Sequence, residues 1–275
     1  MKRIAVISNR TKDKDYRYTK ALAAILKGRA LIVMPKEDEA SGIDAVFCSE
    51  DLYSGADAVI ILGGDGTILQ AAEPCGRSGI PVMGINLGKV GFMTEVEAED
   101  MRAACDRLLA GDFETQNRMM MEIEVESAEG SKQKFLALND AVLSKPSAEM
   151  ITTELYEDGE KVSEYIADGL IISTPTGSTG YSLSAGGPVA DPQMELFIAT
   201  PICAHTLSAR PMLLSADKVI NVKLFGSCTA TVTVDGEDKC SIGTGDKVTI
   251  RRADCYFKLI KLGKQSFYHT MMAKL

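Results

Sequence analysis

Short apolar runs rich in β-branched residues alternate with longer amphipathic stretches through the first part of the chain. Strands are expected at Ile4–Ser8, Ala30–Met34, Ala58–Leu62 and Pro81–Ile85, and helices at Tyr16–Lys27 and Ala98–Leu109. The run Val59–Leu62 is apolar on both faces, as a central covered strand should be. This order of elements is typical of a parallel sheet with covering helices. We therefore predict an N-terminal α/β domain over residues 1–111.

The hydrophobic pattern changes to a period of two after Gly111. Met121–Glu126 alternates apolar and charged side chains, and residues 220–224 and 230–234 alternate apolar and polar ones. The pairs Asp158-Gly159 and Asp235-Gly236 separate such runs and predict hairpin turns. We predict a mostly antiparallel β domain over residues 112–263, with a C-terminal tail, about residues 264–275, packing back on the first domain.

Composition places the chain among ordinary folded proteins. Of its 275 residues, 45% are hydrophobic and 25% charged, which disfavours disorder, collagen and coiled coil. The formal net charge of −8 offers no general attraction for DNA or RNA, so no nucleic-acid partner is expected. A small anionic ligand remains compatible, because backbone amides and helix starts bind phosphate whatever the net charge.

Cysteine and histidine usage limits the chemistry further. The seven cysteines form no CxxC pair, which disfavours a zinc knuckle or a disulfide scaffold, and the two histidines cannot build a His-rich metal centre. No metal-ligating residues are predicted. No apolar run approaches the roughly 18 residues of a membrane helix, and the apolar run near the start, about five positions, is shorter than expected for a signal sequence. We expect a cytoplasmic protein without a membrane partner.

The most informative segment is Gly63-Gly64-Asp65-Gly66-Thr67, which directly follows the expected buried strand. Glycines allow a tight turn and close approach of the backbone to phosphate oxygens. Asp65 would lie at the carboxyl end of that strand, where open α/β sheets bind ligands. The segment matches neither GxxxxGK[ST] nor GxGxxG. A tight turn in which Asp65 only caps the helix is the alternative.

Hydroxyl side chains are concentrated in a second segment, Thr174–Ser184, after the apolar run Leu170–Ile172. Such a loop can hydrogen-bond ribose hydroxyls and phosphate oxygens, and Tyr181 offers a flat face to a base or pyridine ring. The alternative is a turn whose hydroxyls satisfy its own backbone.

Three other segments give weaker signals. Asn86–Phe92 is a glycine-punctuated segment that is more often a loop than a site. Asn139-Asp140 could present an amide and a carboxylate to an adenosine, although a plain turn is the simpler interpretation. Met119–Met121 is interpreted as core filler.

Together and in this order, these segments resemble the ATP-NAD kinase family. The Gly-Gly-Asp-Gly element alone is shared with phosphofructokinases and diacylglycerol-type lipid kinases. Its combination with T-P-T-G-S-T-G-Y-S-L-S-A-G-G-P, Thr174–Pro188, is much more specific, and Thr200–Pro211 adds to the resemblance. The implied activity is transfer of the γ-phosphate of ATP to the 2′-hydroxyl of the adenosine ribose of NAD, giving NADP.

The resemblance also implies site residues. Asp65 would be the catalytic carboxylate, with Gly63, Gly64 and Thr67 near the ATP phosphates. The residues implied to bind NAD are Asp65, Gly66, Asn139, Asp140, Asp168, Thr176, Thr179, Gly180, Tyr181, Ser182, Leu183, Ser184 and Glu237. Mg²⁺ or another divalent cation would accompany ATP, and a homodimer or homotetramer is expected.

Several positions depart from the family pattern. Asp140 replaces the usual glutamate, and Gly180 replaces the usual alanine. A histidine often found after the Gly-Gly-Pro motif is absent from Val189–Pro192, and Gln70 and Ile166 stand where basic residues often approach the NAD phosphates. These departures bear on substrate affinity and on the choice between NAD and NADH. The alternatives are a lipid or sugar kinase that shares the first motif and a non-catalytic dinucleotide-binding protein.

Overall fold

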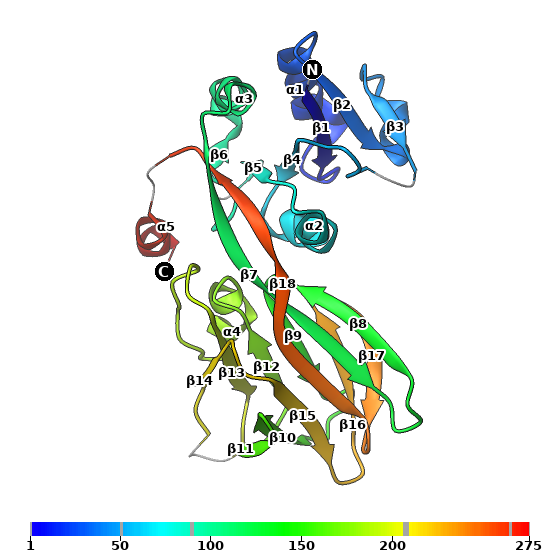
Figure 1. Ribbon diagram of the computed structural model, residues 1–275, viewed down its shortest axis with the longest axis vertical. Coiled ribbons are helices and arrows are strands. Elements are labelled where there is room, and N and C mark those ends of the chain that lie inside the picture. The colour runs from blue at the N-terminus through cyan, green and yellow to red at the C-terminus, as the bar shows by residue number, and fades with distance from the viewer. Residues whose placement is uncertain (1, 50–51, 89–90, 206–208, 264–265, 275) are drawn as a thin grey trace. The chain divides into compact units, whose positions relative to one another are not determined.

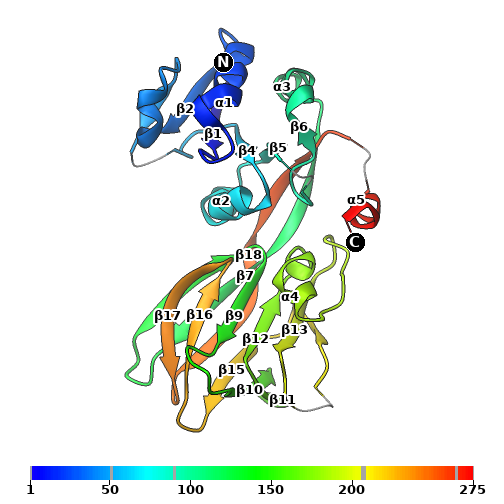
Figure 2. The same cartoon turned by 180° about the vertical axis from the view of Figure 1, so that it is seen from behind.

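The computed structural model describes residues 2–49, 52–88, 91–205, 209–263 and 266–274. The chain divides into two compact units, residues 1–117 with 256–275 and residues 118–255 (Figure 1 and Figure 2). Two long strands, β7 (Glu114–Glu126) and β18 (Lys247–Lys261), run through the division. The boundaries therefore differ from those expected at 111 and 263. The alternation of side chains along a strand continues where the strand passes from one unit to the other, so the sequence does not mark the boundary.

A parallel sheet forms the basis of the N-terminal unit. Its strand order is β18-β5-β4-β1-β2-β3, and β6 also pairs with β5. The strands are β1 (Lys2–Ser8), β2 (Ala30–Pro35), β3 (Val46–Cys48), β4 (Ala58–Gly63), β5 (Val82–Asn86) and β6 (Val96–Glu97). The α-helices are α1 (Arg17–Leu26), α2 (Asp65–Ser78), α3 (Met101–Ala110) and α5 (Phe267–Lys274), with 3-10 turns at Lys14–Tyr16, Lys36–Ser41 and Ala98–Asp100. The strands and helices predicted here are confirmed, with ends shifted by up to three residues.

Alternate residues of the central strands face different helices. Leu62 of β4 belongs to a buried cluster with Leu22 of α1 and Cys105 of α3. On the opposite side of the sheet, a Cβ built on Gly84 of β5 would lie 2.9 Å from Cδ1 of Ile68 in α2. Helices therefore cover both faces, which explains why β4 is apolar throughout.

Two antiparallel sheets make up the second unit. One has the order β14-β13-β12-β9-β16-β17, and in the other β11-β10-β15 leads to β18, while β7 pairs with β8 and β18. The strands are β8 (Lys132–Ala137), β9 (Asp140–Ser144), β10 (Ile151–Glu157), β11 (Glu160–Ala167), β12 (Gly169–Ser173), β13 (Leu196–Ile202), β14 (Met212–Ser215), β15 (Ile220–Phe225), β16 (Thr229–Val234) and β17 (Glu237–Gly243). A 3-10 turn, η4 (Gly177–Thr179), precedes the short helix α4 (Tyr181–Ser184).

Side chains from both sheets share one apolar core in this unit. Phe197 of β13 packs in the same buried cluster as Leu155 of β10 and Val222 of β15. Met119–Met121 is buried, which confirms its interpretation as core filler. The two Asp-Gly pairs join β10 to β11 and β16 to β17, and each has positive φ at both residues. That geometry suits the right-handed twist of a hairpin and confirms the predicted turns.

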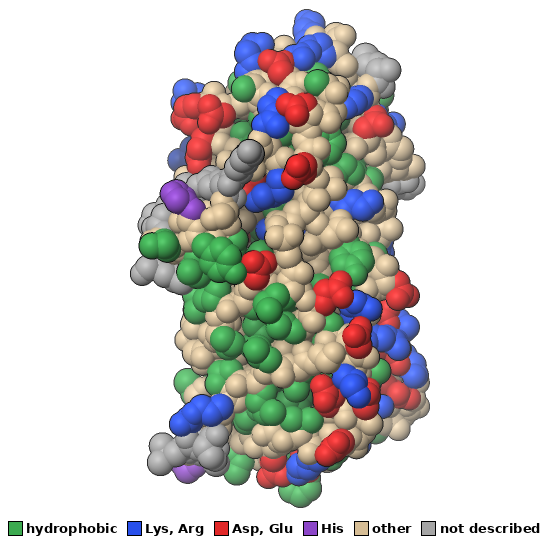
Figure 3. All heavy atoms as spheres, turned by 60° about the vertical axis from the view of Figure 1, so that its left-hand side comes forward, with side chains coloured by type: hydrophobic (Ala, Val, Ile, Leu, Met, Phe, Trp, Pro, Cys, Tyr) green, Lys and Arg blue, Asp and Glu red, His purple; other side chains and the backbone are tan. Residues whose placement is uncertain are grey.

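The surface of the antiparallel unit carries a concentration of hydrophobic side chains (Figure 3). The large exposed ones among its described residues are Met150, Ile166, Tyr181, Met194, Leu213, Val219 and Phe225. None of the helices in the described part of the chain has the length and hydropathy of a transmembrane segment.

Candidate active site

The turn between β4 and α2 places the Gly-Gly-Asp-Gly sequence at the carboxyl edge of the parallel sheet. Every residue of β4 is buried, and the strand ends at Gly63. A Cβ at Gly63 would collide with the Thr67 side chain. The carbonyl of Gly64 accepts the N–H groups of Thr67 at 2.9 Å and Ile68 at 3.2 Å, so α2 begins at Asp65. The first N–H groups of such a helix lack intrahelical partners and can bind anionic oxygens.

Asp65 is held by the loop that follows β5. Its Oδ2 accepts the backbone N–H of Phe92 at 2.7 Å, and its Oδ1 accepts that of Met93 at 3.0 Å. A Cβ at Gly91 would collide with this carboxylate, so glycine permits the approach. Both bonds reach a neighbouring loop rather than the start of α2, which distinguishes Asp65 from a helix cap. The carboxylate is half-buried with a fixed orientation, and its remaining lone pairs can still accept hydrogen bonds.

The Asn86–Phe92 segment supplies this support, although residues 89 and 90 lie outside the described part of the chain. The Asn86 side chain closes the turn by donating to the carbonyl of Gly88 at 2.9 Å and accepting the Gly88 N–H at 3.1 Å. A further ion pair joins Glu95 to Lys261 of β18. The loop therefore acts as a support for Asp65.

Asn9, which the sequence did not single out, joins the end of β1 to the glycine turn. Its Nδ2 donates to Oγ1 of Thr67 at 3.0 Å, and its backbone N–H donates to the carbonyl of Leu62 at 2.8 Å. The only sequence signal for Asn9 is its place just after a predicted strand, at the edge where the other predicted strands also end.

In the antiparallel unit, Asp235 fixes the Asn139-Asp140 bend. Its carboxylate accepts the backbone N–H groups of Leu138 at 2.7 Å, Asn139 at 2.8 Å and Asp140 at 3.0 Å. Burial raises the pKa of Asp235 above its ordinary value, although these three donors oppose the shift. Asp235 was predicted only as a turn residue, so its anchoring role escaped the sequence analysis.

Asp140 begins β9 and is buried beside this anchor. Burial, and to a smaller extent the charge of Asp235, raises the pKa of the Asp140 carboxyl to about 7. A Cβ built on Gly180 would lie 3.9 Å from Oδ2 of Asp140 and 3.6 Å from Nδ2 of Asn139. The shorter acid and the missing methyl, both departures from the family pattern, are therefore neighbours.

The hydroxyl-rich segment divides into satisfied and unsatisfied groups. Thr174 donates to the carbonyl of Leu138 at 2.5 Å, and Ser178 donates to that of Pro175 at 2.7 Å. Ser182 is buried and shares a 2.9 Å hydrogen bond with Thr200, which favours a structural role for its hydroxyl. By contrast, Oγ1 of Thr176 is buried without a described partner.

Asn139 adds a second unsatisfied atom to this region of the antiparallel unit. Its Oδ1 is buried without a described partner, and its backbone carbonyl accepts the N–H of Thr174 at 2.8 Å. Gly177 packs so closely on the Asn139 backbone that a Cβ there would collide. The bend and the hydroxyl-rich loop therefore bring two unused polar atoms into one region, where a ligand could satisfy them.

The remaining predicted residues vary in position. Tyr181 on α4 is 48% exposed, so its ring is available to a ligand. Asp168 precedes β12 and pairs with Lys145 at 2.6 Å, whereas the hydroxyl-rich loop follows the other end of that strand. Glu237 begins β17, is exposed and pairs with Lys239. Strand β12 thus separates Asp168, at its beginning, from the Asn139-Asp140 bend, which lies beside its end. The other residues are half-buried or exposed, as follows: Gly66, Thr179, Gly180, Leu183 and Ser184.

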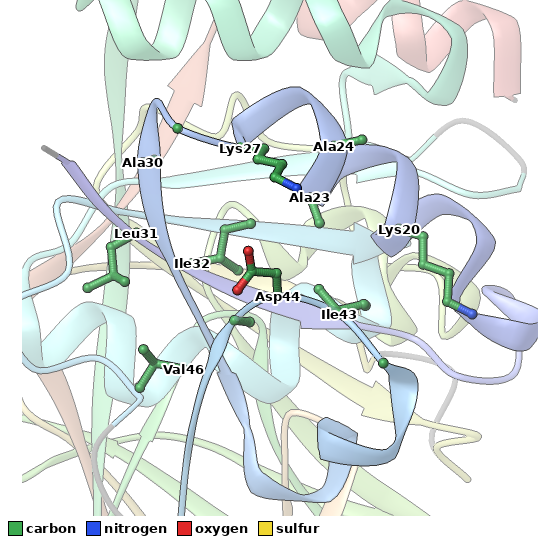
Figure 4. Close-up of a pocket in the computed structure, with 13 residues that line it drawn as sticks. Lys20, Ala23, Ala24, Lys27, Ala30, Leu31, Ile32, Ile43, Asp44 and Val46 are labelled. Atoms are coloured by element: carbon green, nitrogen blue, oxygen red, sulfur yellow. The ribbon is translucent and has the colours of Figure 1, made fainter.

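A separate cavity of about 400 Å³ lies between α1 and the strands β2 and β3 (Figure 4). Ala23 and Ile43 contribute apolar lining, and Lys20, Lys27 and Asp44 are its charged residues. None of the predicted site residues lines it. It is therefore not part of the candidate active site.

Comparison with known proteins decides the family. Residues 4–113 match the ATP-NAD kinase N-terminal domain, and residues 138–262 match the ATP-NAD kinase C-terminal domain. An NAD kinase from Lachnoclostridium phytofermentans is 36% identical over 100% of this chain and 99% of its own length. The chain belongs to the ATP-NAD kinase family. An NAD kinase from Heliobacterium modesticaldum is 42% identical over 80% of this chain and 78% of its own length.

Solved structures agree with this ATP-NAD kinase fold. An NAD kinase from Archaeoglobus fulgidus, solved in complex with ATP, has a TM-score of 0.77 and 27% identity, covering 99% of this chain and 98% of that one. Yeast NADH kinase, solved with NADH, has a TM-score of 0.90 and 22% identity over 100% of this chain and 87% of that one. The yeast likeness establishes the fold alone.

Proposed function

We propose that this protein is an NAD kinase that transfers the γ-phosphate of ATP to the 2′-hydroxyl of the adenosine ribose of NAD. The observation that carries the proposal is the fixed carboxylate of Asp65 at the start of α2, directly after two glycines, in a chain of the ATP-NAD kinase family. That membership favours an NAD kinase over a lipid or sugar kinase that shares only the first motif. The retained Asp65 carboxylate disfavours a non-catalytic dinucleotide-binding protein.

Phosphoryl transfer requires alignment and neutralisation of charge more than covalent chemistry by the protein. Gly63, Gly64 and Thr67 would contact the donor phosphates through the glycine turn. Asp65 would orient the 2′-hydroxyl, whose oxygen forms a bond to the γ-phosphorus as the bond to the ADP oxygen breaks. A carboxylate is too weak a base to remove this proton early, so Asp65 would accept it late in the transfer.

NAD binding is assigned to the residues implied by the family resemblance. Asn139 and Asp140 would hold the adenosine, and Tyr181 would stack on a ring. Gly66, Asp168, Thr176, Thr179, Gly180, Ser182, Leu183, Ser184 and Glu237 complete the proposed contacts. Oδ1 of Asn139 and Oγ1 of Thr176 are buried without a hydrogen-bond partner among the described residues. They support this assignment, because a ligand would supply the missing hydrogen bonds.

A divalent cation would arrive with ATP as the MgATP substrate. Among the described residues, no group of three His, Cys, Asp or Glu side chains is arranged to hold a metal ion. Mg²⁺ bound mainly by substrate phosphates and water is consistent with this observation, since such ions need few protein ligands. Its charge would reduce the negative charge on the transferred group.

Two further assignments concern the setting of the enzyme. We place it in the cytoplasm, because its seven cysteines carry thiols. We also expect a homodimer or homotetramer, supported by the exposed hydrophobic side chains of the antiparallel unit. Light scattering on a gel-filtration column distinguishes these assemblies from a monomer.

The direct test is to incubate the protein with NAD, ATP and Mg²⁺ and to detect NADP with an NADP-specific dehydrogenase. The expected result is that the wild type forms NADP and that Asp65→Asn forms it more slowly by about 100-fold or more. Parallel reactions with NADH, and with inorganic polyphosphate in place of ATP, define the acceptor and the donor. Absence of NADP from the NAD reactions, together with absence of NADPH from the NADH reaction, would overturn the proposal.

A further inference from the structure

A lysine in the loop after β1 lies over the glycine turn. Strands β1 and β4 are parallel neighbours, and Ser8 at the end of β1 pairs with Leu62. The loop that begins at Asn9 therefore emerges at the same sheet edge as Gly63 and Gly64. A Cβ built on Gly64 would lie 2.8 Å from Nζ of Lys12.

The same ammonium group also reaches the end of β5. A Cβ on Gly88 would lie 3.4 Å from Nζ of Lys12. Because neither Gly64 nor Gly88 has a side chain, the ammonium group lies close to the backbone of two successive turns. One of these turns starts α2 and the other follows Asn86.

Local hydrogen bonds build this loop. Oδ1 of Asn9 accepts the Thr11 hydroxyl at 2.6 Å and the Lys12 N–H at 3.3 Å, and the Asn9 carbonyl accepts the Lys12 N–H at 3.0 Å. The next residue, Asp13, is buried and accepts the N–H groups of Tyr18 at 2.7 Å and Thr19 at 3.0 Å. The Lys12 backbone is therefore held between two ordered residues.

The positive charge of Lys12 has no ion-pair partner among the residues that the structure describes. Lys12 is exposed, and its ammonium group forms no ion pair with any carboxylate in the described ranges. The carboxylate of Asp65, the residue after Gly64, accepts two backbone N–H groups. A positive charge over glycine backbone, beside a helix N-terminus, suits a polyanion better than a neutral ligand.

We infer that Lys12 binds the triphosphate of the ATP donor and that Asn9 is its positioning residue. This inference rests on the proposed function and deepens it. The glycine amides would supply directional hydrogen bonds to phosphate oxygens, and Lys12 would supply the charge that the family's glycine motif lacks. Asn9 would act through the loop and through its bond to Thr67 on the same turn.

The test compares Lys12→Met, Lys12→Arg and the control Lys14→Met, an exposed lysine of the same segment. With saturating NAD, Lys12→Met is expected to raise the KM for MgATP about 10- to 100-fold, as for loss of a charged hydrogen bond. Its KM for NAD should stay within about twofold, and Lys12→Arg should restore part of the loss because it keeps the charge. Lys14→Met should match the wild type.

Calorimetric titration with MgATP and with inorganic triphosphate, without NAD, provides a readout independent of turnover. Weaker binding of both ligands by Lys12→Met supports the inference, and wild-type affinity for both would overturn it. If the wild type makes no NADP but binds triphosphate through Lys12, the proposed function fails and the Lys12 site remains. If Lys12→Met forms NADP with the wild-type KM for MgATP, the Lys12 role fails and the function remains.

Asn9→Ala tests the positioning role. The variant should bind MgATP more weakly, and adding it to Lys12→Met should cause little further loss, since both changes remove one interaction. Independent, multiplicative losses in the double variant would contradict positioning by Asn9. Thermal unfolding of each variant separates these effects from general loss of structure.

Discussion

The backbone N–H of Phe92 donates a 2.7 Å hydrogen bond to the carboxylate of Asp65. Replacing Asp65 with Asn puts an NH₂ group opposite one of its two N–H donors. One hydrogen bond is then lost, which lowers the free energy of unfolding by about 1 kcal/mol. Asp65→Asn should fold, retain much of its NAD binding and lose two or more orders of magnitude, about 100-fold, in kcat. Steady-state kinetics with calorimetric NAD binding measures both effects. Turnover within a few-fold of wild type would remove Asp65 from its proposed role.

Phe92 also connects Asp65 to the C-terminal helix. The rings of Phe92 and Phe267 lie 5.8 Å apart between centroids, and the Lys274 ammonium lies 4.5 Å from the Phe92 centroid. Phe267→Ala should lower kcat about three- to tenfold, with a stability loss of at least the about 0.5–1.5 kcal/mol of an aromatic pair. Met272→Ala, at an exposed position on the same helix, is the control. Equal kcat in both variants would show that the helix does not act on Asp65.

Tyr181 offers a test of ring stacking. Because its side chain is 48% exposed, Tyr181→Ala should leave the unfolding temperature nearly unchanged. If the ring stacks on the dinucleotide, the variant raises the KM for NAD more than the KM for ATP. Equal increases in the two KM values would instead indicate structural damage.

Asp140 predicts a specific pH dependence of stability. Burial and, to a smaller extent, the charge of Asp235 raise the pKa of its carboxyl to about 7 in the folded protein. In the unfolded chain the pKa of the same carboxyl is near 3.8. Its contribution to the free energy of unfolding is therefore complete below about pH 4 and is lost as pH rises to about 7. The loss is at most about 4 kcal/mol.

Urea titrations of wild type and Asp140→Asn between pH 4 and 8 measure this contribution. The variant should lose part of the downward slope and be the more stable protein near pH 8, since an amide carries no charge to bury. Asp235 also titrates above its ordinary pKa and should leave a residual slope. Parallel curves for the two proteins would rule out titration of Asp140 in this range.

Asp235 anchors the proposed adenosine contacts without touching a ligand itself in this scheme. Asp235→Ala removes the acceptor for three N–H groups and should lower the free energy of unfolding by about 2–4 kcal/mol. It should also raise the KM for NAD more than that for ATP, because the Asn139-Asp140 bend loses its shape. Asp238→Asn, two residues beyond the turn, is the control. An unchanged KM for NAD in a folded Asp235→Ala protein would dissociate the bend from NAD binding.

Local signals made much of this structure predictable. The central strand β4 is apolar on both faces and is followed by glycines, so both the strand and the turn after it are visible in a few adjacent residues. The Asp-Gly hairpins are similarly local, because positive φ at both positions selects these residues. The family resemblance then proposed roles for positions that local pattern alone left as loops.

Long-range contacts escaped prediction for a physical reason. Asp235 binds N–H groups about 95 residues earlier in the chain, and Asn9 binds Thr67, 58 residues later. No periodicity or spacing encodes such pairs, since only the fold brings them together. Asp168 shows the converse: it is close in sequence to the hydroxyl-rich loop, yet an extended strand of five residues separates them.

The return of the chain through β18 has a consequence for biosynthesis. The part of β18 that pairs with β5 comes from residues 256–275, with Leu259 pairing with Val82, whereas residues 118–255 form a compact unit of their own. During translation the inserted unit can thus finish first, while the sheet that carries Asp65 waits for its last strand. A stalled or truncated nascent chain would leave β5 without its partner at Val82 and open there to a foreign strand.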